Sequence, residues 1–141
     1  IIDEANYISN GVLGDLKLLF NFEMDSRDRA VVLLCGLGQL NNTLRLSVHE
    51  PLRQRLAMNF HMEGMTKEEG RSYIREKLKG AGCSHAIFDD AALEAILNAS
   101  DGTPRMVNRL CTASLLCAEA GNLNLVDADI VMQAINDCEL G

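Results

Sequence analysis

Along the first sixty residues, short apolar runs alternate with segments in which apolar side chains recur every three or four positions. The first two residues are isoleucines that run directly into two carboxylates, a pattern typical of the end of a buried strand. Residues 30–35 form a continuous apolar run closed by Gly36, as in a strand covered on both faces of a parallel sheet. In residues 56–62 large apolar side chains alternate with small or polar ones, which predicts a third strand.

Helices are predicted between these strands. Apolar residues at helical spacing over residues 12–20 predict one helix, and the polar run of residues 23–29 predicts a loop. A second helix of about two turns is expected over residues 39–46. Pro51 is expected to open a short helical turn that ends near Arg53.

After Gly64 the pattern is helical to the end of the chain. Thr66, followed three residues later by Glu69, forms a capping box that begins the first of four predicted helices. The predicted fold class is therefore α/β: residues 1–63 form the remnant of a parallel sheet with flanking helices, and residues 64–141 form an all-helical subdomain. Capping residues mark the starts of the other three helices: Asp89, Thr103 with Pro104, and Asp127.

The composition is that of one ordinary globular domain. The chain has 141 residues, of which 48% are hydrophobic and 23% are charged. Its formal net charge of −7 argues against a surface that holds nucleic acid by bulk neutralisation of phosphates, and leaves only local basic spots for that purpose. The apolar runs are far shorter than the roughly 20 residues that a membrane span requires, so we expect no such span.

The cysteines predict the cellular compartment, and the first residues predict a longer parent protein. Five widely spaced cysteines without a CxxC pair predict neither a disulfide framework nor a zinc site, and they fit a reducing cytoplasm. Cys83 and His85 lie two positions apart but lack a second pair of metal ligands. The chain starts without Met or a signal peptide and inside a strand pattern, so we expect that it was cut from something longer.

Two carboxylates at the carboxyl end of the first predicted strand are candidates for chemistry, because open α/β sheets bind ligands at this edge. Asp3 could hold a magnesium ion bound to nucleotide phosphates, and Glu4 could orient or deprotonate an attacking water. The alternative is that both residues only cap the following helix. The dipeptide alone favours that alternative.

Three arginines occupy informative positions. Arg105 lies in the first turn of a predicted helix, where the helix dipole disfavours cations, so a partner anion is expected. Arg53 and Arg55 directly precede the third predicted strand, at a sheet edge from which they could reach a neighbouring molecule. The alternative for each is an ordinary solvated side chain, which spacing alone does not exclude.

The order of these motifs is more specific than any one of them. The chain starts with Ile-Ile-Asp-Glu-Ala, continues with the strand before Gly36, and has Glu-Pro-Leu-Arg-Gln-Arg-Leu at residues 50–56 and Gly-Thr-Pro-Arg at residues 102–105. In this order it resembles the AAA+ ATPases of the general-secretion A type, with most similarity to the ATPase subunits that accompany bacterial transposases. The resemblance covers nearly the whole chain but only the second half of such a protein, from the Walker B motif onward.

The resemblance implies a role for each candidate residue. Asp3 and Glu4 match the Walker B pair, with Asp3 helping to hold magnesium and Glu4 activating water. Arg55, or Arg53 as the second choice, matches the arginine finger that reaches the nucleotide of the next subunit. Arg105 matches the second sensor, an arginine of the helical lid that contacts the phosphates of its own subunit.

The same resemblance assigns the two parts of the chain and their partners. Residues 1–63 correspond to the C-terminal part of the AAA+ nucleotide-binding core, and residues 64–141 to a four-helix lid subdomain. The parent is expected to form a homo-oligomer that couples ATP hydrolysis to remodelling a partner, namely a transposase with DNA. A secretion-type assembly is an alternative partner. A non-enzymatic helical module that binds protein or DNA is the alternative from a different class.

Two departures from the family pattern bear on activity. Leu37 stands where the family has a polar first sensor, and the nearest polar side chains are Gln39 and Asn41. No G-x-x-x-x-G-K-[ST] motif occurs in the chain, so the phosphate cradle is expected upstream of Ile1. We therefore expect the parent to need ATP and Mg²⁺, and the chain alone to need neither and to be inactive. Without the cradle strand, unpaired strand edges are expected to cause self-association or a rearranged sheet.

Overall fold

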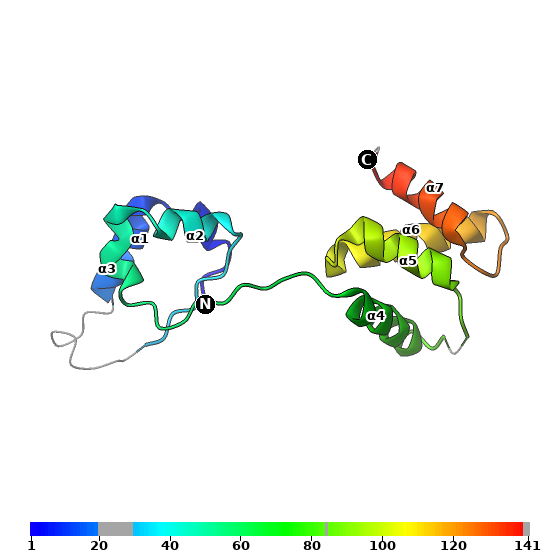
Figure 1. Cartoon of the computed structure of the whole chain (residues 1–141), viewed down its shortest axis with the longest axis horizontal. Helices are drawn as coiled ribbons and strands as arrows, with labels where there is room; N and C mark the ends of the chain where they lie inside the picture. The colour runs from blue at the N-terminus through cyan, green and yellow to red at the C-terminus, as the bar shows by residue number, and fades with distance from the viewer. Residues whose placement is uncertain (20–29, 84, 140–141) are drawn as a thin grey trace. The chain divides into compact units, whose positions relative to one another are not determined.

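The computed structural model describes the backbone of residues 1–19, 30–83 and 85–139 (Figure 1). The chain divides into two compact units, Ile1–Phe60 and His61–Gly141, which we call the first and second unit. In the described part of the chain, no helix is long and apolar enough to cross a lipid bilayer. The predicted loop over residues 23–29, and Phe20 before it, lie outside the described residues.

Short helices pack around a small leucine core in the first unit. Helix α1 (Asn10–Leu19) and helix α2 (Gln39–Leu44) confirm the two helices predicted from spacing. Helix α3 (Glu50–Arg53) follows the 3-10 turn η2 (Ser47–His49), and Pro51 lies in its first turn, where a missing N–H breaks no helical hydrogen bond. The buried residues of this core are Ala5, Leu13, Leu16, Leu40, Leu44 and Leu52.

A single parallel pair, Ile2 with Leu34, joins the two predicted strands before α2. The N–H of Ile2 donates to the carbonyl oxygen of Leu33, and the N–H of Cys35 donates to the carbonyl oxygen of Ile2, both at 2.8 Å. The two apolar runs therefore lie side by side and in the same direction, but they pair only at this position. In the described part of the first unit, the predicted sheet remnant is reduced to this pair.

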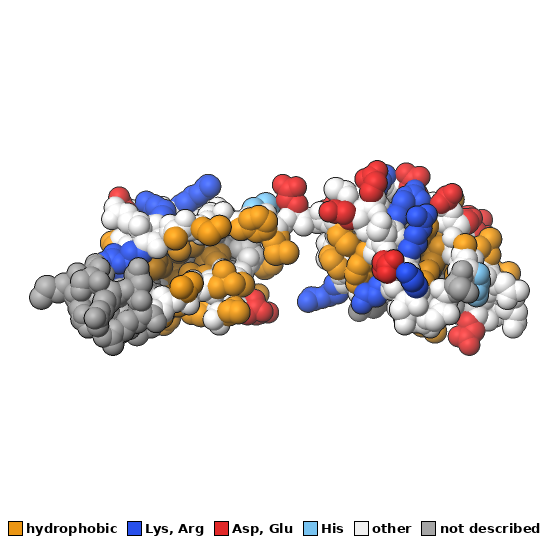
Figure 2. Space-filling model, turned by 90° about the horizontal axis from the view of Figure 1, so that it is seen from below, with side chains coloured by type: hydrophobic (Ala, Val, Ile, Leu, Met, Phe, Trp, Pro, Cys, Tyr) orange, Lys and Arg blue, Asp and Glu red, His pale blue; other side chains and the backbone are white. Residues whose placement is uncertain are grey.

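The third predicted strand, residues 56–62, is wrong. These residues form no strand, and no backbone hydrogen bond joins residues 57–62 to another described residue. A strand needs a neighbouring backbone with which to exchange hydrogen bonds, and no described segment supplies one. Met58, on the predicted buried face of this strand, is 86% exposed. The expected burial of residues 30–35 on both faces is wrong as well, because Val31 is 96% exposed. Figure 2 shows hydrophobic side chains on the surface of the first unit.

The second unit contains the four helices predicted after Gly64. They are α4 (Lys67–Gly80), α5 (Asp90–Ser100), α6 (Pro104–Ala120) and α7 (Ala128–Glu139). The capping box of α4 is confirmed in full, and Asp89 and Asp127 accept hydrogen bonds from the N–H groups of Ala92 and Ile130 at 2.6 and 3.0 Å. Thr103 occupies the N-cap position of α6, but its side chain makes no capping hydrogen bond, so that part of the prediction is wrong.

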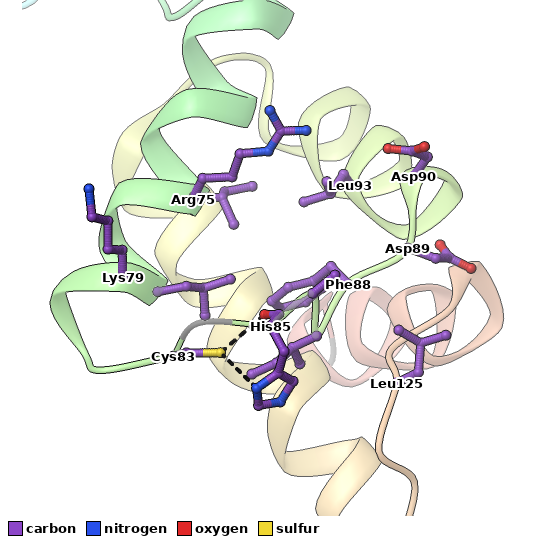
Figure 3. Close-up of a pocket in the computed structure, with 13 residues that line it drawn as sticks. Arg75, Lys79, Cys83, His85, Phe88, Asp89, Asp90, Leu93 and Leu125 are labelled. Carbon is purple, nitrogen blue, oxygen red and sulfur yellow. Dashed lines mark hydrogen bonds between the residues drawn. The ribbon is translucent and has the colours of Figure 1, made fainter.

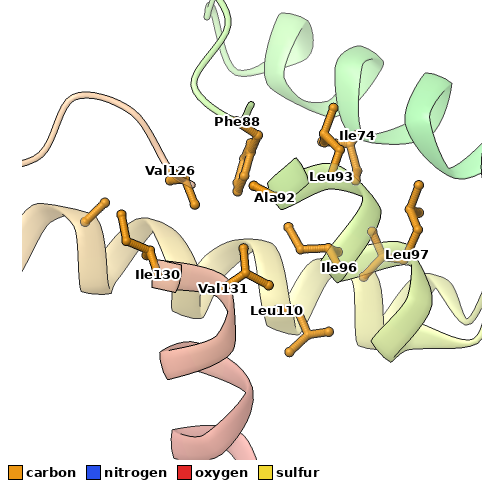
Figure 4. Packing of buried hydrophobic residues seen from close by; sticks show 12 residues of the cluster. Ile74, Phe88, Ala92, Leu93, Ile96, Leu97, Leu110, Val126, Ile130 and Val131 are labelled. Atoms are coloured by element: carbon orange, nitrogen blue, oxygen red, sulfur yellow. The ribbon is translucent and has the colours of Figure 1, made fainter. Parts of the chain in front are cut away.

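The core of the second unit lies between α5, α6 and α7 and is closed by α4 (Figure 4). A parallel contact between Phe88 and Val126 joins the segments before α5 and α7, with the N–H of Val126 donating to the carbonyl oxygen of Ile87 at 2.7 Å. The core is largely aliphatic, and its most buried side chains include Ile96, Val107, Leu110, Val126 and Val131. Truncation of such side chains typically costs about 2–5 kcal/mol, so this unit has its own source of stability.

Two glycines bring the start of the second unit against the turn before α6. The N–H of Met65 donates to the carbonyl oxygen of Gly102 at 2.8 Å. Gly102 has a φ of 68°, in the left-handed region, and a Cβ at this position would lie 2.7 Å from the backbone nitrogen of Met65. A Cβ on Gly64 would lie 2.7 Å from the carbonyl oxygen of Asp101. This close backbone approach fixes the residues that lead into α6.

Candidate functional site

The parallel pair in the first unit brings two carboxylates and a glycine-containing loop to the same end of the paired segments. Asp3 and Glu4 follow Ile2, and Gly36 follows Leu34 and Cys35. The N–H of Ala5 continues the contact by donating to the carbonyl oxygen of Cys35 at 2.8 Å. Asp3, Glu4 and Gly36 therefore lie at the same end of this pair.

Glu4 has an unusual backbone conformation at this edge. Its φ is 51° and its ψ is 36°, in the left-handed region, which a residue with a side chain adopts at a cost of about 1–3 kcal/mol. The conformation is held locally: the N–H of Glu4 donates to Oδ1 of Asp3 at 2.8 Å, and its carbonyl oxygen accepts from the N–H of Tyr7 at 3.0 Å. The 3-10 turn η1 (Ala5–Tyr7) follows directly. Both carboxylates are exposed, so they are accessible to a ligand.

Asn6 links the turn after Glu4 to the loop after Leu34. Its Oδ1 accepts a hydrogen bond from the N–H of Leu37 at 3.0 Å. The sequence pattern does not single out Asn6, because Asn6 and Leu37 are 31 positions apart and are brought together by the Ile2–Leu34 pair. The available signal was local: asparagine in a short turn commonly accepts a hydrogen bond from a backbone N–H.

Near Leu37, where a first sensor is expected, no described polar side chain of residues 37–41 forms a hydrogen bond with Asp3 or Glu4. Leu37 is exposed, and Gln39 is exposed at the start of α2. Asn41 lies two residues further along α2, and its Oδ1 accepts from Nδ2 of Asn59 at 3.4 Å. The departure from the family pattern at Leu37 therefore remains.

The two arginines at α3 differ in what they contact. Nη1 of Arg53 donates to the carbonyl oxygen of Leu44 at 3.0 Å. Leu44 is the last residue of α2, and terminal carbonyls of a helix have no partner within the helix, so Arg53 caps α2. Arg55 lies just beyond α3, and its Nη1 donates to the carbonyl oxygen of Pro51 at 3.2 Å. The Arg55 side chain is exposed.

Arg105 belongs to the second unit, at the second position of α6. The turn at Gly102 and the cap residue Thr103 lead directly to it. It is exposed and forms no hydrogen bond or ion pair with the residues that the structure describes. A cation in the first helical turn faces the positive end of the helix dipole, so intramolecular contacts do not explain this position.

Asp3 and Glu4 are candidates to bind Mg²⁺ together with a phosphate ligand. Among residues 1–19, 30–83 and 85–139, no group of three or more His, Cys, Asp or Glu side chains could hold a metal ion by itself. Mg²⁺ at phosphate-transfer sites needs less, because one or two carboxylates complete a shell made of waters and substrate phosphates. Among the hydrogen bonds of the described residues, Asp3 accepts with Oδ1 alone, from the N–H of Glu4, so its other carboxylate oxygen fits that role.

The second unit also has a hollow of about 760 Å³ between α4 and the segment before α5 (Figure 3). Arg75 and Lys79 line it from α4, and Phe88 lines it from the segment before α5. Sγ of Cys83 lies 3.2 Å from the carbonyl oxygen of His85 and 3.8 Å from Nδ1 of the His85 ring. The residues predicted to carry chemistry do not line this hollow.

Comparison with known proteins identifies relatives in sequence. The general secretion pathway protein A of Aeromonas hydrophila is 34% identical over 135 residues, which cover 95% of this chain and 25% of that protein. An uncharacterised HTH-type transcriptional regulator of Methanocaldococcus jannaschii is 24% identical over 141 residues, 96% of this chain and 34% of that protein. No protein-family model matches the chain.

Two solved structures share the fold. The Holliday junction branch migration motor RuvB of Thermotoga maritima has a TM-score of 0.68 at 24% identity. The match covers 96% of this chain and 42% of the RuvB chain. A point mutant of the same RuvB has a TM-score of 0.67 at 22% identity. The chain spans about a quarter of the first sequence relative and less than half of the solved chains, so the match concerns a part of each of these proteins.

Proposed function

We propose that this chain, a homologue of the AAA+ ATPases of the general-secretion A type, provides the Walker B, arginine-finger and second-sensor residues of an ATP-hydrolysing protein. The observation that carries the proposal is the parallel Ile2–Leu34 pair, which presents Asp3 and Glu4 at one edge in a relative of such an ATPase. In this proposal residues 1–63 are part of the nucleotide-binding core, and residues 64–141 are the lid.

At the Walker B pair, Asp3 would hold Mg²⁺ through the carboxylate oxygen that does not accept from Glu4. The ion would neutralise charge on the nucleotide phosphates. Glu4 would orient a water molecule and accept its proton on the carboxylate. The exposed carboxylate and the hydrogen-bonded, left-handed backbone of Glu4 support this role, because a fixed backbone limits the positions of the carboxylate.

Arg55 is the better candidate for the arginine finger. The guanidinium of Arg53 caps α2, and withdrawing it would leave the carbonyl of Leu44 without this partner. Arg55 has an exposed side chain at the end of α3, from which it would reach the nucleotide of a neighbouring subunit in a homo-oligomer. A positioned arginine of this kind raises the rate of phosphoryl transfer by about 10³–10⁵.

Arg105 would act as the second sensor and contact the phosphates of its own subunit. The side chain of Arg105 is exposed in the first turn of α6 and has no partner among the described residues. Both facts support the proposal, because an anionic phosphate would then neutralise the charge of Arg105. The Gly64–Gly102 approach would couple the position of α6 to the start of the lid.

The 141 residues alone should not hydrolyse ATP, because they contain no glycine-rich phosphate cradle. Titration of the chain with a fluorescent ATP analogue tests this directly. No binding at micromolar nucleotide is expected. Micromolar affinity, or magnesium-dependent turnover by this chain, would contradict the proposed division of the site.

The remodelled partner follows from the resemblance. The motif order favours a transposase with DNA, whereas the name of the Aeromonas relative favours a secretion-type assembly. The net charge of −7 gives this chain no bulk surface for DNA, so we propose that contact with DNA, if transposition is the process, is made outside these residues. Hydrolysis by the complete protein with and without double-stranded DNA separates the two partners, because only the transposition role predicts stimulation by DNA.

A non-enzymatic helical module is the competing function. Its supporting observation is the second unit, a four-helix body with its own core, in which the acidic residues Asp89 and Asp127 serve as caps. One measurement separates the two functions. The complete protein of the ATPase hydrolyses ATP and loses most of that activity on Glu4→Gln, whereas a binding module shows no hydrolysis that depends on Glu4.

A further inference from the structure

Asn6 joins the two segments that carry the proposed catalytic edge. Three contacts tie residues 2–6 to residues 33–37: the Ile2–Leu34 pair, the hydrogen bond from the N–H of Ala5 to the carbonyl oxygen of Cys35, and the hydrogen bond from the N–H of Leu37 to Oδ1 of Asn6. The first two use backbone atoms alone. The third is a side-chain contact, so it depends on the identity of residue 6.

These contacts flank Glu4 on both sides. Glu4 has left-handed φ and ψ, a conformation that persists only when surrounding contacts determine it. The backbone hydrogen bonds of Ile2 precede it, and the backbone hydrogen bond of Ala5 and the side-chain hydrogen bond of Asn6 follow it. Loss of the Asn6 contact would free the downstream side of this turn, and the carboxylate of Glu4 would then be less well fixed.

Gly36 shows how close this contact is. A Cβ on Gly36 would lie 2.9 Å from Oδ1 of Asn6, 3.1 Å from its backbone nitrogen and 3.3 Å from a methyl group of Leu40. Distances below 3.4 Å require a neighbour to move, and here one of the neighbours is backbone. The absence of a side chain at Gly36 therefore permits Asn6 to reach the N–H of Leu37.

We propose that Asn6 is a positioning residue for Glu4, which it fixes by binding the backbone of Leu37 across the catalytic edge. The expected effect on catalysis rests on the proposed ATPase function, whereas the hydrogen bond between Asn6 and Leu37 is independent of that function. Displacement of a catalytic group by about 1 Å can lower a rate by about 10²-fold. We therefore expect Asn6 to affect turnover rather than nucleotide affinity.

The first measurement concerns the contact and needs no activity. Amide hydrogen exchange in the 141-residue chain should show the N–H of Leu37 protected in the wild type. Asn6→Ala should speed its exchange by about tenfold or more, while Asn6→Asp, which keeps an acceptor oxygen of the same reach, should retain protection. Equal exchange in all three proteins would overturn the proposal at its structural premise.

The second measurement is ATP hydrolysis by the complete protein that contains this chain. Asn6→Ala should lower kcat by about 10-fold to 100-fold and leave KM within about twofold, and Asn6→Asp should recover most of kcat. Asn10→Ala is the matched control, because it removes another side-chain amide, which binds Nε2 of the buried His49 at 2.8 Å. This control should lose at least as much folding stability and keep its kcat.

Gly36→Ala is a second way to break the hydrogen bond between Asn6 and Leu37. Its methyl group should displace Asn6 and reproduce the fall in kcat, and the double variant with Asn6→Ala should be no slower than either single variant. A wild-type kcat in Asn6→Ala, with hydrolysis still lost in Glu4→Gln, would overturn the inference and leave the proposed function intact. Hydrolysis unaffected by Glu4→Gln would instead remove the proposed function, and the role of Asn6 with it.

Discussion

The guanidinium of Arg53 donates a hydrogen bond to the carbonyl oxygen of Leu44, the last residue of α2, at 3.0 Å. This contact joins α3 to α2 within the first unit, next to the site proposed for the arginine finger. It distinguishes Arg53 from Arg55, the second and first choices for the arginine finger in the sequence. Arg53 has a structural partner in a helix end, whereas Arg55 contacts the turn of its own segment.

Replacing the two arginines should therefore have different effects. Arg53→Ala should destabilise the 141-residue chain by about 1–2 kcal/mol, because it removes a charged hydrogen bond to a helix end. Arg55→Ala should lower hydrolysis by the complete protein by about 10³-fold or more. Urea unfolding and steady-state hydrolysis measure the two effects.

Arg45→Ala is the control for both variants, because Arg45 is an exposed arginine at the C-cap of α2. It should change stability by no more than about 0.5 kcal/mol and leave hydrolysis unchanged. Loss of hydrolysis in Arg53→Ala but not in Arg55→Ala would reverse the assignment of the finger.

The close approach of Gly102 to Met65 predicts that replacing glycine by alanine destabilises the protein at this position and not at an open one. Gly102→Ala adds a methyl group to a left-handed residue within van der Waals overlap of backbone atoms, so it should destabilise the second unit by more than about 1 kcal/mol. Gly80→Ala, at the end of α4 with no atom within 4 Å of the new methyl, should be neutral or stabilising by up to about 1 kcal/mol. Thermal unfolding of the two variants compares them, and equal melting temperatures would contradict the close approach.

Glu69 predicts a pH-dependent contribution from the capping box of α4. Its carboxylate accepts from the backbone N–H of Thr66 at 2.8 Å and from the Thr66 hydroxyl at 3.0 Å, and these bonds lower the pKa of Glu69 below its ordinary value. A lowered folded-state pKa gives stability that is present above the ordinary carboxyl pKa and is lost as the pH falls through the folded-state pKa.

The stability difference between wild type and Glu69→Gln should therefore be largest near neutral pH and shrink as the pH falls through the lowered pKa of Glu69. Urea midpoints across this range measure it. Glu68→Gln, at the neighbouring carboxylate in the same helical turn, controls for the helix dipole. A difference that stays constant with pH would show that the capping bond does not depend on the charge of Glu69.

Cys111 should be the slowest thiol to react. Burial raises the pKa of the Cys111 thiol from 9.0 to about 11, so its thiolate fraction at mildly alkaline pH falls by about 100-fold. Timed alkylation with iodoacetamide and peptide mass spectrometry should show Cys111 labelled last and Cys83 well before it. In concentrated urea the difference should vanish. Rapid labelling of Cys111 in the native chain would contradict its burial.

The helices of the second unit could be predicted from sequence because their signals are local. Thr66 and Glu69 lie three residues apart and bind each other, and Asp89 and Asp127 each bind an N–H three residues ahead. Such contacts need only the correct residues at the correct spacing. Thr103 shows the limit of the method, because the residue type is right for a cap but its side chain makes no capping bond.

The strands were predicted less well because pairing is not local. The pattern of residues 56–62 is that of a strand face, yet only a neighbouring backbone makes a strand, and Met58 and Phe60 are exposed instead. Of the site, the carboxylate pair and its place at the end of a parallel pair were predictable. The link between Asn6 and Leu37 was not, since it joins residues 31 positions apart.

Hydrolysis by Glu4→Gln in the complete protein tests the central claim most directly. Gln keeps the size of the side chain but removes its ability to accept a proton, so hydrolysis should fall by about 10²–10⁴-fold while ATP still binds with wild-type affinity. Glu63→Gln, an exposed carboxylate near the boundary of the two units, should behave as the wild type. Wild-type hydrolysis by Glu4→Gln would contradict the account, because the carboxylate at this edge would then have no part in the chemistry.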